Sequence, residues 1–124
     1  MKICQLDHVA IHVKDVEVSQ KFYRDALKLE DLPRPAFDFP GAWFRLGTTQ
    51  ELHLIGNRKK EVTSARRGDH FAMQIDDPDI WEAHLQQQQV EYIRKHRPDN
   101  THQIFIQDPD GHWIELCCPS ELPE

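Results

Sequence analysis

Three histidines and one glutamate stand at positions from which they could bind one metal ion. His8 and His70 each occur in a run of the form Asp-His-x-Ala, and the second run follows the first after 62 positions, half of the 124 residues. His53 follows His8 by 45 positions, and Glu115 follows His70 by the same 45. Each half of the sequence therefore carries one candidate ligand early and another late.

Imidazole nitrogens and a carboxylate form a ligand set for a divalent transition metal. If a pseudo-twofold axis relates the halves, the four equivalent positions converge on one point. Such a set suits Fe(II), Mn(II), Ni(II), Co(II) or Zn(II), and an octahedral ion would keep one or two positions open for water or substrate. A single strand histidine is more often a hydrogen-bonded structural residue than a ligand. The repeat and the four ligand-capable side chains together favour the metal site.

The elements that must position these residues follow the same order, β-α-β-β-β, in each half. In the first half, alternating and helical apolar spacing predicts a strand over 6–13, a helix over 15–29, an irregular edge strand among the prolines of 33–40, and a hairpin of strands 42–46 and 50–55. In the second half, it predicts a strand over 69–75, a helix over 77–89, a strand over 91–96, and a hairpin of strands 102–107 and 112–117. The predicted class is α+β, with tandem modules at 1–56 and 69–119, a linker at 57–68 and a short tail at 120–124.

The totals are those of one compact, soluble globular domain. Hydrophobic residues make up 39% and charged residues 29% of a chain long enough to bury a core. A net charge of −6 gives no electrostatic reason to bind nucleic acid or an anionic membrane. There is no apolar run of membrane-spanning length and no signal-peptide pattern, and the 3 cysteines are an odd number. We therefore expect a cytoplasmic protein with reduced thiols, a small-molecule substrate, and neither a nucleic-acid nor a membrane partner.

Several motifs make the chain resemble a known family. They are Leu6-Asp-His-Val-Ala-Ile, Phe22-Tyr-Arg, Gly68-Asp-His-Phe-Ala and Asp108-Pro-Asp-Gly-His-Trp-Ile-Glu-Leu. With them, nearly the whole chain resembles the vicinal oxygen chelate superfamily, which includes glyoxalase I, extradiol dioxygenases, fosfomycin-resistance enzymes and methylmalonyl-CoA epimerase. The resemblance implies a single domain whose paired modules form a cupped mixed sheet around a metal. It also implies a homodimer, in which the metal site can be shared between chains.

Carried over by position, the resemblance implies His8, His53, His70 and Glu115 as metal ligands, with Glu115 also a general base. Glyoxalase I usually has Glu where this chain has His53, and the epimerase has Gln. The dioxygenases and fosfomycin enzymes need only the other three ligands. Where fosfomycin enzymes often place a phosphonate-binding Tyr, this chain has Phe105.

Three groups of functions are compatible with such a site. The first is a glyoxalase-I-like lyase or isomerase, in which Glu115 moves a proton next to a carbonyl while the metal stabilises an enediolate. The second is Fe(II) extradiol cleavage by a facial triad of His8, His70 and Glu115, with His53 or His12 as a nearby acid or base. The third comprises a thiol transferase of the fosfomycin-resistance type and a non-catalytic small-molecule-binding protein.

Other residues are candidates for contacts with substrate. These are His12, Trp43, Arg45, Phe105 and Trp113. A thiol-adduct substrate would bring carboxylates, which arginines could hold by paired hydrogen bonds. The candidates for that role are Arg34, Arg45, Arg66, Arg67 and Arg94. His112 lies beside a turn and is predicted to be solvated.

Overall fold

The computed structural model describes residues 1–120, and its elements repeat the predicted β-α-β-β-β order twice. The chain divides into a first unit, residues 1–60, and a second unit, residues 61–124. Apart from Ser120, the tail predicted at 120–124 lies outside the described residues. The predicted α+β class is confirmed, because each unit combines one helix with a mixed sheet of four strands.

The first unit contains the sheet that carries His8 and His53. Its elements are β1 (His8–His12), α1 (Val16–Asp25), β2 (Asp31–Leu32), β3 (Gly41–Leu46) and β4 (Gln50–Ile55). The strand order is β1-β4-β3-β2, with β1 parallel to β4 and the other pairs antiparallel. The hairpin of β3 and β4 is confirmed within one residue of its predicted bounds.

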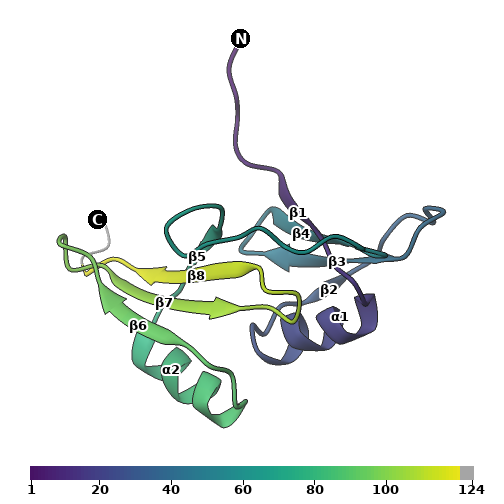
Figure 1. Ribbon diagram of the computed structural model, residues 1–124. Helices are drawn as coiled ribbons and strands as arrows, with labels where there is room; N and C mark the ends of the chain where they lie inside the picture. The colour runs from purple at the N-terminus through teal and green to yellow at the C-terminus, as the bar shows by residue number, and fades with distance from the viewer. Residues whose placement is uncertain (121–124) are drawn as a thin grey trace. The chain divides into compact units, whose positions relative to one another are not determined.

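The second unit repeats this arrangement. Its elements are β5 (Phe71–Gln74), α2 (Pro78–Gln87), β6 (Ile93–His96), β7 (His102–Gln107) and β8 (Trp113–Cys118). The strand order is β5-β8-β7-β6, and β5 is parallel to β8. Figure 1 shows α2 lying along one face of this sheet. In the part of the chain that the structure describes, no helix is both long enough and apolar enough to cross a membrane.

Both helices begin at an aspartate whose carboxylate caps the first turn. Asp15 accepts hydrogen bonds from the backbone N–H groups of Glu17 and Val18 at 3.0 and 3.3 Å. Asp77 does the same for Asp79 and Ile80 at 3.0 and 3.2 Å. Each carboxylate satisfies N–H groups that have no partner inside the helix. The two helix starts are therefore determined locally by the sequence.

Each sheet has a buried face and an opposite face that carries the candidate ligands. On the buried faces, apolar side chains pack with the helix of the same unit. In the first unit these are Tyr23, Ala26, Leu27, Ala42, Phe44, Leu46, Leu52 and Leu54, and in the second Leu85, Ile104, Ile106, Ile114 and Leu116. Because side chains alternate along a strand, the residues between them face away from the helix. His53 and Glu115 are among these residues.

The repeat of 62 positions holds for most of the fold but fails in β6. Val9 pairs with Leu52 in the first unit, and Phe71 pairs with Ile114 in the second, as the offset requires. Leu32 pairs with Trp43, however, whereas Ile93 pairs with Phe105, so β6 is offset from β2 by 61 positions. The residue with a left-handed backbone after each helix, Lys28 or Gln89, is also offset by 61 (φ 58° in both). The predicted offset of 62 is therefore wrong between the end of α2 and β6. The second unit has one residue fewer before β6 than the first unit has before β2.

Candidate metal centre

In the first unit, His8 and His53 lie against each other on the sheet face opposite α1. The parallel pairing of β1 and β4 places His53 across from Ala10, diagonal to His8. Their rings stack with centroids 4.2 Å apart and planes inclined by 18°. The constant spacing of 45 residues therefore corresponds to a real side-chain contact in this unit.

Each of these histidines is oriented by a carboxylate. His8 Nδ1 lies 2.7 Å from Asp7 Oδ2, which directs its Nε2 away from Asp7. A carboxylate on one ring nitrogen is the usual way in which a metal-binding histidine is oriented. His53 Nε2 lies 2.9 Å from Glu51 Oε1, and its other ring face stacks on Trp43 at 4.0 Å. His53 could bind a metal through Nε2 only by giving up the Glu51 hydrogen bond.

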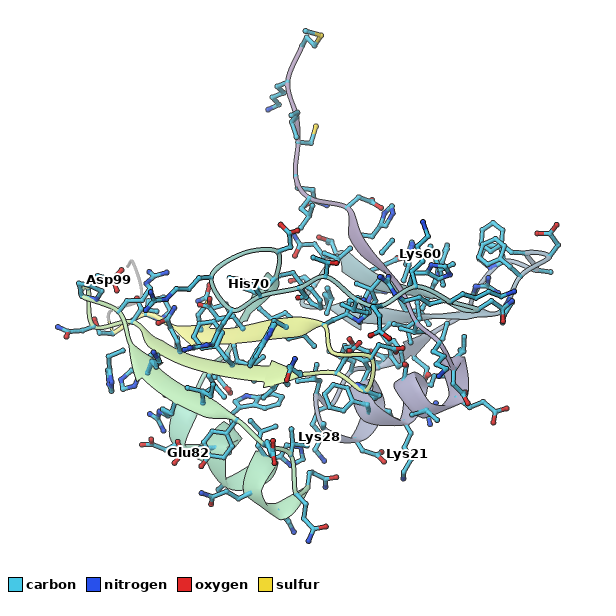
Figure 2. The ribbon with its side chains drawn as sticks, in the orientation of Figure 1. Lys21, Lys28, Lys60, His70, Glu82 and Asp99 are labelled. Atoms are coloured by element: carbon cyan, nitrogen blue, oxygen red, sulfur yellow. The ribbon has the colours of Figure 1, made fainter. Side chains whose placement is uncertain are left out.

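In the second unit, His70 and Glu115 form the corresponding pair. His70 Nε2 lies 3.2 Å from Glu115 Oε1, with the two side chains 22% and 8% exposed. Two atoms that each bind one ion at ~2.1 Å are roughly 3.0–3.4 Å apart in octahedral or tetrahedral geometry. The pair therefore fits a shared divalent metal ion. Figure 2 shows His70 on the opposite side of the sheet from α2, which carries Glu82.

The Glu115 carboxylate is held from both sides. Gln103 Nε2 donates a hydrogen bond to Glu115 Oε2 at 3.2 Å, while Oε1 faces His70. The His70 and Phe105 rings are nearly perpendicular, with planes inclined by 80° and centroids 6.0 Å apart. Burial, and then the negative charge of Glu115, raise the pKa of the Cys117 thiol.

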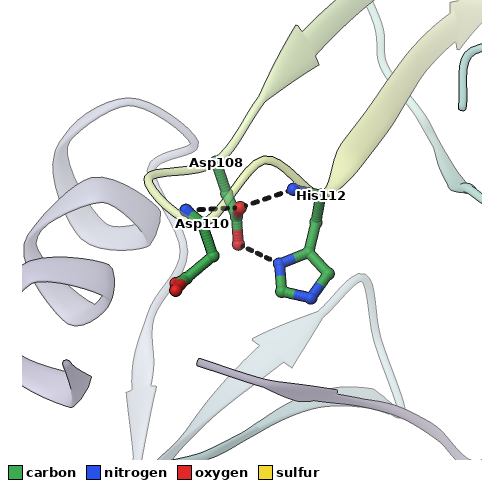
Figure 3. Close-up of side chains that lie close together, drawn as sticks. All are labelled: Asp108, Asp110 and His112. Carbon is green, nitrogen blue, oxygen red and sulfur yellow. Dashed lines mark hydrogen bonds and ion pairs between the residues drawn. The ribbon is translucent and has the colours of Figure 1, made fainter. Parts of the chain in front are cut away.

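A second group of possible ligands lies in the turn between β7 and β8. Ligand atoms of Asp108, Asp110 and His112 lie within 4.8 Å of one another (Figure 3). Asp108 Oδ1 accepts hydrogen bonds from the N–H groups of Asp110 and His112 at 3.0 and 2.8 Å, and Oδ2 lies 2.8 Å from His112 Nδ1. These bonds make the buried Asp108 the centre of the turn. The prediction that His112 is solvated is wrong, because its side chain is 13% exposed and bonded to this carboxylate.

The predicted substrate residues lie in different surroundings. His12 Nε2 is 2.8 Å from the Gly56 carbonyl, as expected of a structural histidine, and Arg45 donates to the Thr48 carbonyl of its own hairpin at 3.3 Å. Trp43 lies against His53. Phe105 and Trp113 line a pocket of about 660 Å³ in the second unit. Contact of these residues with substrate stays a prediction.

Sequence reasoning missed the carboxylates and the amide that support the site. The sequence marks Asp7 only as part of the repeated motif, and no sequence pattern marks Glu51 or Gln103. Their signal is the strand register: Glu51 is directly opposite His8, and Gln103 is paired with Cys117, two residues from Glu115. That register becomes visible only when the pairing of the strands is known.

Comparison with known proteins agrees with the geometry. The model of the Glyoxalase/Bleomycin resistance protein/Dioxygenase superfamily matches residues 5–116. The chain therefore belongs to this family, and the resemblance to the vicinal oxygen chelate superfamily is confirmed.

Relatives within the family include enzymes of more than one type. Glyoxylase I 4 of Arabidopsis thaliana is 26% identical, over 99% of this chain and 75% of its own length. Metallothiol transferase FosB of Bacillus licheniformis is 29% identical, over 93% of this chain and 75% of its own length. Lactoylglutathione lyase of Schizosaccharomyces pombe is 32% identical over 98% of this chain, which spans only 49% of that enzyme. A crystal structure of a protein assigned to the glyoxalase family from Bacillus anthracis has a TM-score of 0.83 and 28% identity, covering 97% of this chain and 98% of its own.

Proposed function

We propose that this protein is a metal-dependent lyase or isomerase of the glyoxalase I type, acting on a small substrate with vicinal oxygens. The observation that carries the proposal is the His70–Glu115 pair, a buried carboxylate 3.2 Å from an imidazole nitrogen. The Arabidopsis and fission-yeast relatives support the lyase.

In this proposal, one Ni, Co, Zn, Fe or Mn ion is held by His8, His70 and Glu115. His53 becomes the fourth ligand once its ring gives up the hydrogen bond to Glu51. The ion would supply Lewis-acid stabilisation of negative charge on the substrate oxygens. His8 is suited to ligation because Asp7 engages its Nδ1 at 2.7 Å. We further propose a cytoplasmic homodimer, with the ligands joined within one chain or across the two.

Glu115 is the proposed general base. Its carboxylate is buried, and a buried base beside a hydrogen-bond donor can remove a proton next to a carbonyl and return it to the neighbouring carbon. Gln103 would keep Oε2 in place, since the amide donates to Oε2 at 3.2 Å, while Oε1 would give up its role as a ligand and take the proton. One base is sufficient for this transfer because both carbons lie in the same pocket.

A thiol transferase is the second candidate, since metallothiol transferases FosB of Bacillus licheniformis and Staphylococcus epidermidis are 29% and 30% identical. Phe105, which replaces the expected phosphonate-binding Tyr, makes this activity less favourable. An Fe(II) extradiol dioxygenase is a third candidate, because it needs the same three ligands. A non-catalytic binding protein would use the same pocket without turnover.

Metal analysis and proton exchange test the proposal. Protein purified without oxygen is expected to hold Ni, Co or Zn and to convert methylglyoxal with glutathione, taking up deuterium from deuterated water at the carbon that is reprotonated. Glu115→Gln should lower turnover by about 10²–10⁴-fold, as removal of a general base does. Glu30→Gln, an exposed control, should not. Absence of bound metal after reconstitution would reject the enzyme, and tightly bound iron with catechol cleavage would assign the dioxygenase.

A further inference from the structure

The pocket in the second unit has a lining that is almost free of charge. It has a volume of about 660 Å³ and lies between the end of α2, the following segment and strands β7 and β8. Five of its nine lining residues are aromatic or aliphatic, three are glutamines, and Glu91 is the single charged one. The apolar side chains include Tyr92, Phe105 and Trp113.

Two aromatic residues of the pocket lining lie on the same face of the sheet as the proposed catalytic carboxylate. Phe105 is the direct cross-strand neighbour of Glu115, so both side chains are on the same face of the sheet. Phe105 also lies edge-on to His70 at 6.0 Å. Trp113 is two residues before Glu115 on β8, again on this face. A substrate held by His70 and Glu115 would therefore extend its remote part over Phe105 towards Trp113.

The equivalent surface of the first unit shows how much charge this pocket lacks. In the first unit, Arg24 on α1 donates to Asp31 at the start of β2, with an Nε–Oδ2 distance of 2.9 Å. In the second unit, Gln86 on α2 donates to the Tyr92 hydroxyl at 2.8 Å. The same link between helix and edge strand is ionic in one unit and neutral in the other.

Three more positions follow the same change. In the register of the repeat, Gln107 corresponds to Arg45 and Trp113 to Glu51, and these residues pair across their hairpins in both units. Gln89 corresponds to Lys28, because both have the left-handed backbone that follows the helix. Charged side chains of the first unit are thus replaced by amides and an aromatic ring. Arg66 lies over the Phe105 ring at 5.7 Å but does not line the pocket.

From this lining we infer that the pocket binds an uncharged aromatic part of the substrate, oriented by hydrogen bonds to glutamine amides. An aromatic group would bury its surface against Phe105 and Trp113, while Gln86 and Gln107 can donate to or accept from its polar substituents. A carboxylate in the same place would meet no cation among the lining residues and would be close to Glu91, so its desolvation would not be compensated by the lining. The inference rests on the proposed function for the position of the reacting end, and it requires the carboxylates of a glutathione adduct to lie outside this pocket.

A matched pair of probes tests this preference. We would titrate the protein with 2-hydroxyacetophenone, which is neutral, and with its para-carboxylate derivative, following the Trp113 indole N–H by NMR. The signal is assigned with Trp113→Phe. The neutral probe is expected to bind at least tenfold more tightly than the carboxylate. Equal binding, tighter binding of the carboxylate, or no effect of either probe on Trp113 would overturn the inference.

A substitution in the lining should reduce or abolish the preference for the neutral probe if the lining is responsible for it. Gln107→Arg recreates the cation found at Arg45 and should strengthen carboxylate binding about tenfold. Gln87→Arg adds the same charge on an exposed part of α2 that does not line the pocket, and should leave both affinities unchanged. The titrations are run with and without added Ni²⁺ or Zn²⁺. If the neutral probe is still preferred but no metal binds, the proposed metal-dependent enzyme is rejected and the inference about the pocket is supported. If metal binds but neither probe is preferred, the inference about the pocket is rejected and the metal-dependent enzyme is not.

Discussion

The structure offers two groups of possible metal ligands, and substitutions that affect one group at a time distinguish them. Glu115→Gln keeps the size of the side chain but removes the negative charge that faces His70. Asp110→Asn and His112→Asn make comparable changes in the turn between β7 and β8. We expect the first variant to lose the metal and the other two to keep it.

The expected magnitudes follow from the hydrogen bonds at each group. The Asp108 carboxylate accepts hydrogen bonds from Asp110 N–H and from the N–H and ring of His112, at 3.0, 2.8 and 2.8 Å. A metal that recruited Asp108 would break at least one of them, at a cost of about 1.5–3 kcal/mol for a bond to a charged group. That cost is roughly a 10–150-fold loss of affinity. Metal binding at His70 and Glu115 also replaces one hydrogen bond, from Nε2 to Oε1 at 3.2 Å, but both atoms of that bond become ligands of the ion, whereas recruiting Asp108 Oδ1 would leave backbone N–H groups unpaired.

Titration calorimetry with Ni²⁺ or Zn²⁺ and thermal melting give the two readouts. Glu115→Gln should weaken metal binding by at least the 10–100-fold that loss of an outer-shell partner causes. His112→Asn should leave affinity within about threefold but lower the melting temperature by roughly 3–8 °C, as a loss of ~1–2 kcal/mol does. Asp110→Asn is the milder control in the same turn. Metal retained in Glu115→Gln but lost in His112→Asn or Asp110→Asn would refute the assignment to His70 and Glu115.

Three more predictions concern the first unit. Gly41→Ala should destabilise the protein by about 1–3 kcal/mol in urea unfolding, because a Cβ there would collide with the Leu54 carbonyl; unchanged stability would contradict this contact. The Arg24 hydrogen bond, aided by its charge, lowers the Asp31 pKa, so this ion pair should contribute stability above about pH 4 and lose it as the pH falls further. Asp31→Asn should therefore show a smaller drop in melting temperature on acidification, and a drop as large as that of the unmodified protein would be inconsistent with the pair. His53→Phe, which retains a ring between His8 and Trp43, should lower metal affinity by about tenfold or more if His53 is the fourth ligand, and unchanged calorimetry would assign it to the ring stack alone.

The elements were predictable because their signals are local. Asp15 and Asp77 cap helices through their own side chains, and the hairpins follow from alternating apolar residues on both sides of short turns. The spacing of 45 residues also predicted that each half brings its two candidate ligands together. This succeeded because β1 pairs with β4 and β5 with β8 in parallel, with the same register.

The remainder depended on interactions that local patterns do not encode. His112 looked exposed beside a Pro-Asp-Gly turn, but the buried Asp108 carboxylate holds its ring. The change of offset from 62 to 61 was hidden because the glutamines of residues 86–89 carry no apolar period to mark where the helix ends. Glu51 and Gln103 could not be selected from sequence, since their roles follow from which residue is across the strand.

In the two units, His53 and Glu115 receive their supporting hydrogen bonds from different strands. This difference explains why the pocket is in the second unit. Glu115 is an acceptor, and the amide of Gln103 on β7 supplies its donor. The equivalent position in the first unit is Gly41, where a side chain would collide with the Leu54 carbonyl, so no such donor can be present. His53 instead pairs with a carboxylate on its own strand, Glu51. Because Gln103 supports Glu115 from β7, the β8 position equivalent to Glu51 is not needed for support and carries Trp113, which lines the pocket. The repeated position is a histidine, His53, in the first unit and a glutamate, Glu115, in the second. The unit with the glutamate is also the one with an uncharged aromatic surface on the face of the proposed base.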